Sequence, residues 1–237
     1  LTGHISNLPL VMGVLRQVVS VLPMLLGLLL LVYMQDQFRT YRSVLLYGFL
    51  LAVPAVVSNN FWWHPDGLTF LFAMLTLFFL NRDDLRFGKN FLLAAVFTGI
   101  TAATKLVGFY FFLAVALTLV LGLRNKQLSW KRFVKAALLF LGIMVVSFVV
   151  ANPFLLSHWA RIDYFSTFTQ QTKLLAEGYG ILYDKGLSAA WPTIRQYYGI
   201  ALFLLCAAGT AIAGALQGKR RLLYALPILI GVNVITF

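Results

Sequence analysis

The sequence predicts an all-α fold, a polytopic transmembrane helix bundle with about eight spans. Of its 237 residues, 61% are apolar and only 11% are charged, whereas a soluble domain is about half apolar and about a quarter charged. The mean hydropathy is +0.86. The apolar residues also form long runs with short basic clusters between them, which is the pattern of a multi-pass membrane protein.

A spanning helix needs about 20 mostly apolar residues, and the chain contains a series of runs near that length. The predicted spans are 14–34, 44–57, 61–80, 91–104, 106–123, 133–151, 197–216 and 222–237.

The stretch 91–123 is interrupted by a single charge, Lys105. One helix of this length would measure about 50 Å, which exceeds a hydrocarbon core of about 30 Å. Basic clusters flank both of its ends, so both ends should face the same side of the membrane. We therefore expect two spans with a turn near Lys105.

Basic residues gather in alternate loops, and the positive-inside rule assigns these loops to the cytoplasm. The predicted cytoplasmic loops are 35–43, 81–90, 124–132 and 218–221. The opposite loops hold few basic residues for their length. They are 58–66, the Lys105 turn and 152–196, and the stub 1–13 should lie on the same side.

Residues 1–237 are expected to form one transmembrane module. The chain begins with Leu1 instead of Met and stops inside an apolar run, so we expect it to be an internal piece of a longer protein. The one long loop, 152–196, is rich in aromatic and polar residues. Such residues favour the headgroup zone, which predicts short interfacial helices that form a lid on the outer surface.

Composition also excludes other classes of protein. A net charge of +12 would suggest nucleic-acid binding in a soluble protein. Here the charge follows the loops of a membrane protein, so no nucleic-acid partner is expected. The single cysteine, Cys206, cannot form an internal disulfide and has no metal-binding spacing.

Asp66 stands apart from the other acids. Asp36, Asp83 and Asp84 lie among basic residues of the cytoplasmic loops, and pairing with those charges explains them. Asp66 follows Pro65 at the outer end of a span, where an acid could simply start a helix. Alternatively, a carboxylate partly screened from water at the membrane surface could act as a general base or bind a cation.

Lys105 is the second isolated charge. Its ammonium could snorkel to the outer headgroups. It could instead bind an anion, and with Thr101 and Thr104 close in sequence it would suit a lipid phosphate. Because the topology puts Asp66 and Lys105 on the same face of the membrane, we expect both to line one cavity there.

Histidines and loop cations are weaker candidates. His64 could bind a metal or anchor at the interface, and His158 presents the same alternatives. Arg161, in the large outer loop, could meet a phosphate or an anionic lipid. No cofactor is required by the sequence, although a divalent metal is left open.

Four segments together resemble the GT-C glycosyltransferases, with the closer likeness to the protein O-mannosyltransferase and aminoarabinose-transferase branch, glycosyltransferase family 39. The segments are Trp62-Trp63-His64-Pro65-Asp66-Gly67, Gly99-Ile100-Thr101-Ala102-Ala103-Thr104-Lys105, Leu15-Arg16-Gln17-Val18-Val19-Ser20 and Asn152-Pro153-Phe154. They occur in the family's order and orientation and cover most of the chain.

The resemblance implies transfer of a sugar, a hexose or a pentose, from a polyprenyl-phosphate-type lipid carrier on the extracytoplasmic face. It assigns Asp66 to an acidic active-site position and Lys105 to the donor phosphate. His64, His158 and Arg161, chosen from their residue types and positions, are the further substrate-binding candidates. The family's first outer loop usually carries an acidic pair, and this chain starts after that region. The main catalytic loop is therefore expected to precede Leu1.

The expected partners are a lipid-linked sugar donor, membrane lipids and a larger membrane complex, and the expected location is the bacterial inner membrane in the cell envelope. The alternative function is a non-catalytic transmembrane scaffold subunit of such a complex. A transporter is less favoured, because transporters tend to place ionisable residues near the midplane.

Overall fold

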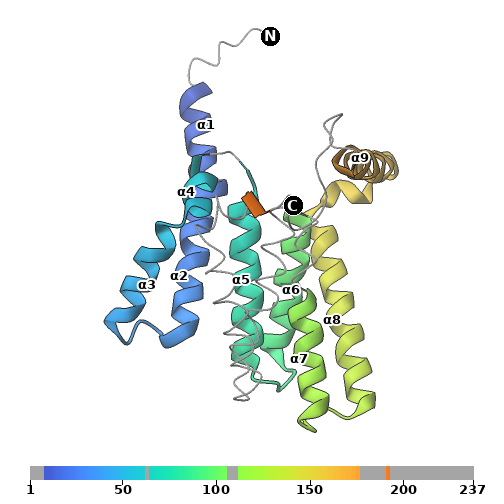
Figure 1. Ribbon diagram of the computed structural model, residues 1–237. Coiled ribbons are helices and arrows are strands. Elements are labelled where there is room, and N and C mark those ends of the chain that lie inside the picture. Colours follow the sequence, from blue (N-terminus) through green and yellow to red (C-terminus); the bar gives the residue numbers. More distant parts are fainter. Residues whose placement is uncertain (1–7, 62–63, 106–111, 177–190, 193–237) are drawn as a thin grey trace.

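A computed structural model describes residues 8–61, 64–105, 112–176 and 191–192, and this part of the chain is all-α (Figure 1). Its elements in chain order are α1 (Leu8–Arg16), the π-helix η1 (Gln17–Val21), α2 (Leu22–Asp36), α3 (Tyr41–Leu51), α4 (Pro54–Phe61), α5 (Asp66–Asp83), α6 (Lys89–Thr104), α7 (Phe112–Arg124), α8 (Trp130–Ala151), the 3-10 helix η3 (Pro153–Leu156) and α9 (His158–Ala176).

The helices run up and down, so the connecting loops collect at two ends (Figure 1). Loops 37–40, 84–88 and 125–129 lie at the end that carries the basic clusters, which we call the basic end. Asp66, Lys105 and Asn152 lie at the opposite end, which we call the outer end because the positive-inside rule assigns it to the outside.

The core of the bundle is built around α5, which packs between α2 and α6, and α6 packs in turn against α8. Met74, Leu77, Phe91 and Phe140 are almost fully buried there. Gly99 permits the close approach of α6 to α8, since a Cβ atom at this position would lie 2.3 Å from the carbonyl oxygen of Met144. This packing fixes the outer end of α6 beside that of α5.

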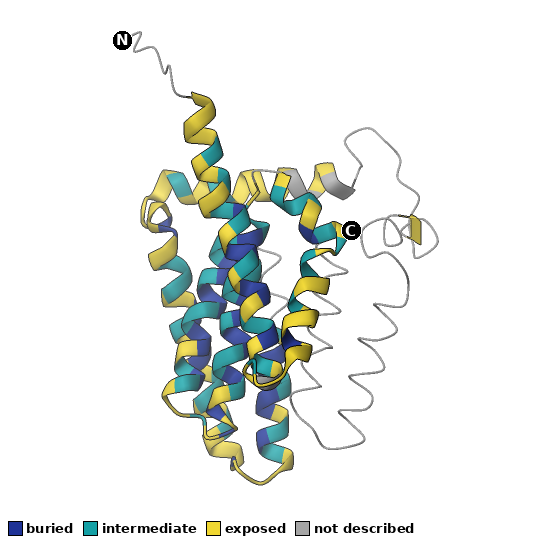
Figure 2. Ribbon diagram, turned by 90° about the vertical axis from the view of Figure 1, so that its left-hand side faces the viewer, coloured by how far each residue is buried: buried dark blue, intermediate teal, exposed yellow. Residues whose placement is uncertain are grey.

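Many large apolar side chains of α1, α3 and α8 are exposed, whereas the central helices hold the buried residues (Figure 2). A soluble monomer rarely exposes so much contiguous apolar surface. These outward faces therefore suit lipid, and the protein is an integral membrane protein.

The prediction of eight spans is not supported. In the described part, two helices are long and apolar enough to cross a membrane, Leu8–Gln35 with 28 residues and Trp130–Ala151 with 22. The pair α3 and α4, bent by 57°, could add a third. The predicted span 44–57 breaks at this bend because Pro54 starts a new helix.

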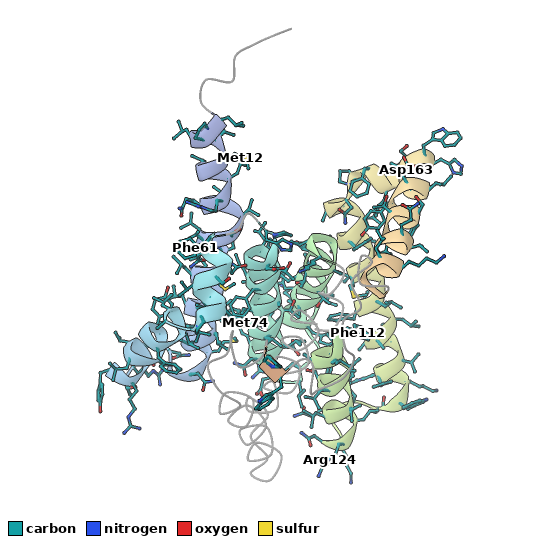
Figure 3. The ribbon with its side chains drawn as sticks, turned by 45° about the horizontal axis from the view of Figure 1, so that its top comes forward. Met12, Phe61, Met74, Phe112, Arg124 and Asp163 are labelled. Carbon is teal, nitrogen blue, oxygen red and sulfur yellow. The ribbon has the colours of Figure 1, made fainter. Side chains whose placement is uncertain are left out.

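The other described spans fall short for different reasons. The run 61–80 begins instead at Asp66, and α5 ends with Arg82 and Asp83, so charges occupy both ends. The helices α6 and α7 have only 16 and 13 residues. They are nevertheless two antiparallel helices, as the turn near Lys105 predicts, and Figure 3 shows Arg124 at the end of α7 away from Phe112. The runs 197–216 and 222–237 lie outside the described residues.

The outer loop 152–196 forms one long helix in its described part. After η3, α9 extends over 19 residues and lies across the outer end instead of crossing the bundle (Figure 1). It packs against η3 and exposes apolar side chains such as Trp159 and Phe165. The exposed aromatic residues of α9 are typical of an interfacial helix, and the short helices predicted over 152–196 stay a prediction, since most of 177–196 lies outside the described residues.

Asp83 does not have the role predicted for it. Its side chain is almost fully buried and accepts hydrogen bonds from the backbone amides of Phe87, Gly88 and Phe91, at 2.6, 2.9 and 3.1 Å. It therefore caps the first turn of α6 instead of pairing with the neighbouring basic residues. The side chain of Asp36 lies outside the described residues.

Candidate functional site

The strap 64–67 leads into α5 at the outer end. Pro65 is the cap residue, and its carbonyl accepts hydrogen bonds from the amide and the hydroxyl of Thr69, at 2.9 and 3.0 Å. Asp66 is therefore the first residue of α5, where the positive end of the helix dipole favours a carboxylate. The helix-start interpretation of Asp66 is correct, and it leaves the carboxylate oxygens free to make other contacts.

Lys105 is the cap residue that follows α6, and it also lies at the outer end. Its backbone turns from helical to extended, with φ −154° and ψ 128°, and its amide still donates to the carbonyl of Thr101 at 3.1 Å. The hydroxyls of Thr101 and Thr104 donate to the carbonyls of Phe97 and Ile100, at 2.6 and 2.8 Å. Since a hydroxyl has one proton to donate, the protons of both threonines are used within the helix in this structure, and their predicted contact with a phosphate stays a prediction.

The strap and the end of α6 meet at Asp66. Lys105 Nζ lies 2.7 Å from Asp66 Oδ1, and His64 Nδ1 lies 3.0 Å from Asp66 Oδ2. About a quarter of the Asp66 and Lys105 side chains is exposed (28% and 27%), and about half of the His64 side chain (51%). The carboxylate is therefore held from both sides while solvent or a ligand can still reach the cluster.

The Asp66–Lys105 ion pair is partly exposed. A partly exposed pair of this kind contributes on the order of 1 kcal/mol or less. A competing anion such as a phosphate could therefore separate the two side chains at small cost. The arrangement suits an anion site at Lys105 with a proton acceptor at Asp66.

Several buried polar groups near the outer end have no hydrogen-bond partner. In the described part of the chain these atoms are Arg16 Nε, Asn59 Nδ2, Asn60 Oδ1 and Asn152 Nδ2. Buried polar atoms are normally paired, so each unpaired one needs an explanation. The four residues lie at the end of α1, the end of α4 and the end of α8, all of which are at the outer end (Figure 1).

His158 and Arg161 are not brought to this cluster by their described contacts. The His158 ring packs edge-on against Trp159, with centroids 5.5 Å apart. Arg161 Nη1 donates to the carbonyls of Leu155 and Leu156, at 3.1 and 3.4 Å, and so ties α9 to η3. Nearby, burial raises the pKa of Tyr164, whose ring packs on Phe154.

Ser20 ends one of the four segments that resemble the GT-C family, but the sequence assigned it no role; it hydrogen-bonds to the backbone of His64 from η1. A serine in an apolar run carries no signal of its own. Among the described residues, no group of three or more His, Cys, Asp or Glu side chains is arranged so that it could hold a metal ion.

Comparison with known proteins gives one match. The model of glycosyltransferase family 87 matches residues 6–236, which is nearly the whole chain. This is a GT-C type family, as the four sequence segments indicated, but the likeness to the family 39 branch has no support from the match. No curated protein and no solved structure matches the chain.

Proposed function

The chain belongs to glycosyltransferase family 87, and from this premise we propose that it transfers a sugar from a polyprenyl-phosphate-type carrier to an acceptor at the outer end. Membership of the family implies an enzyme, so the scaffold alternative loses its support. The carrier, the acceptor hydroxyl or amine and the side of the membrane are the parts that we propose.

One observation carries the proposal, the contact of Lys105 Nζ with Asp66 Oδ1 at 2.7 Å. Each residue is an isolated charge in the sequence at the end of an apolar helix, and we expect the lipid phosphate at this outer end. Charged groups at this depth are costly and tend to mark functional sites. An ammonium next to a carboxylate supplies the two groups that the transfer needs, one for the leaving phosphate and one for the acceptor proton.

The reaction follows from these two groups. The acceptor oxygen or nitrogen forms a bond to the anomeric carbon while the bond from that carbon to the phosphate oxygen breaks, with inversion. The bonding electron pair leaves with the phosphate, whose charge the Lys105 ammonium stabilises. The acceptor proton passes to the Asp66 carboxylate, which acts as general base.

Donor binding would also prepare the base. In the free protein the Lys105 ammonium occupies Asp66 Oδ1, so this oxygen is not open to an acceptor. A donor phosphate that recruits Lys105 Nζ would release Asp66 Oδ1 toward the acceptor. His64 would hold the other oxygen, Oδ2, and keep the carboxylate oriented.

The unpaired polar atoms of Arg16, Asn59, Asn60 and Asn152 support a polar ligand at this end. They include both donors and an acceptor, which is what recognition of sugar hydroxyls requires. A transporter would instead be expected to carry its ionisable residues near the midplane.

The proposal is tested with the full-length protein reconstituted in lipid vesicles. Polyprenyl-phosphate-linked hexoses and pentoses are offered as donors, with the matching nucleotide sugars as controls, and transfer to the membrane fraction is measured. We expect transfer from a lipid-linked donor and none from a nucleotide sugar. Transfer from nucleotide sugars alone would contradict the proposal.

A further inference from the structure

The apolar helix at the start of the described chain is interrupted by one turn of π-helix, which we call the π-turn. The apolar helix Leu8–Gln35 is α-helical except for η1 (Gln17–Val21). A π-turn takes up one extra residue and often occurs at functional sites. Here it faces the outer end, where η1 contacts α4 and α5.

Ser20 lies in this π-turn and uses its hydroxyl differently from six threonines of the described helices. In the described helices, Thr69, Thr76, Thr98, Thr101, Thr104 and Thr118 each donate to the carbonyl four residues earlier. Ser20 instead donates to the carbonyl of His64 at 2.8 Å and accepts from the amide of His64 at 3.2 Å. Its side chain is fully buried, so the two bonds form a clamp shielded from water.

Gly67 makes a second contact between the same two elements. A Cβ atom at this position would lie 2.2 Å from the carbonyl oxygen of Ser20, too close for any side chain. The strap therefore lies with its backbone directly on η1. The clamp and the close approach are independent features, and both hold residues 64–67 against the π-turn.

We propose that Ser20 is a positioning residue, which fixes the His64 backbone and through it the imidazole that contacts Asp66 Oδ2. This inference rests on the proposed function of Asp66. The carboxylate is held by α6 through Lys105 on one side and by η1 through the strap on the other. Loss of the clamp would leave the His64 amide and carbonyl without these partners, and the strap would shift.

The kinetic test compares Ser20→Ala and Ser20→Cys in the full-length enzyme, with Ser43→Ala as the matched control. Ser43 is also a buried serine, but it lies at the start of α3 at the basic end. We expect Ser20→Ala to lower kcat at least about ten-fold with donor KM nearly unchanged, since a shift of about 1 Å can cost about a hundred-fold. The kcat of Ser20→Cys should lie between those of the wild type and Ser20→Ala, because a thiol forms weaker hydrogen bonds than a hydroxyl.

An unchanged kcat in Ser20→Ala would contradict the inference, and so would an equal loss in Ser20→Ala and Ser43→Ala. A second measurement does not depend on catalysis. With Cys206 replaced by Ser, the variant His64→Cys keeps the backbone bonds to Ser20, and its rate of reaction with an impermeant maleimide is measured with and without Ser20→Ala.

We expect Ser20→Ala to speed this labelling several-fold because the strap is released. An equal rate in both backgrounds would overturn the positioning role even if the enzyme is active. Failure of the proposed function has a different signature, namely full transfer activity in Asp66→Asn, and it leaves the labelling result unaffected.

Discussion

The Nζ atom of Lys105 lies 2.7 Å from Oδ1 of Asp66, although 39 residues separate them in the sequence. The contact joins the end of α6 to the start of α5, two helices that pack along their length in the core. The packing of α5 against α6 therefore sets the distance between the two charged side chains.

Lys105→Ala should raise the donor KM at least about ten-fold, because a phosphate loses a charge-assisted partner worth about 1.5–3 kcal/mol. Lys105→Arg should retain most of the affinity, since the charge stays. Initial rates at varied donor concentration measure both. Equal donor KM values in Lys105→Ala and the wild type would remove Lys105 from the phosphate site.

Gly99→Ala should destabilise the bundle by about 1–3 kcal/mol, the usual cost of overpacking. The added Cβ would lie 2.3 Å from the Met144 carbonyl oxygen, and backbone cannot move aside easily. Gly142→Ala on the neighbouring helix α8 is the control, because nothing lies within 4 Å of a Cβ there. Thermal unfolding in detergent compares them, and similar melting temperatures would refute the α6–α8 packing described.

Asp83→Ala should cost about 1–3 kcal/mol of stability, because buried backbone amides at the start of α6 lose their acceptor. Asp84→Asn is the comparison, since Asp84 is the adjacent acid, is exposed, and has a φ of 51° that asparagine tolerates. Hydrogen exchange of the Phe87 and Phe91 amides should accelerate in Asp83→Ala. Unchanged exchange at both amides would show that the cap is dispensable.

The orientation of the bundle is tested by cysteine labelling in a Cys206→Ser background on intact cells. Ser157→Cys, exposed at the outer end, should react with an impermeant maleimide, and Asn125→Cys, exposed at the basic end, should not. Permeabilised cells should label both. The reverse pattern on intact cells would place Asp66 and Lys105 on the cytoplasmic side.

Much of this arrangement could be predicted from the sequence. The basic clusters gave the two ends of the bundle, and the flanking charges of 91–123 gave the reversal near Lys105. Asp66 and Lys105 were recognisable because each is an isolated charge beside apolar runs. These predictions rest on where charged residues lie relative to apolar runs, so they do not depend on the exact ends of the helices.

The remaining features depend on geometry that no local pattern encodes. Ser20 becomes significant only when the π-turn brings it to the His64 backbone, and Asp83 became a cap because the turn 84–88 folds its amides inward. The eight predicted spans assumed that each apolar run is one straight helix, whereas Pro54 divides one run and charges shorten another. His158 and Arg161 were chosen by residue type and by their place in the outer loop; their described contacts are within η3 and α9, and their role in substrate binding stays a prediction.

The most direct test of the central claim is the rate of sugar transfer by Asp66→Asn in the full-length enzyme, measured beside donor affinity. Asp163→Asn is the matched control, because Asp163 is an exposed acid on α9 at the same end. We expect Asp66→Asn to lower kcat about 10²–10⁴-fold, the range for loss of a general base, with donor affinity little changed. Asp163→Asn should behave as the wild type. Full activity in Asp66→Asn would contradict the assignment of this cluster as the catalytic site.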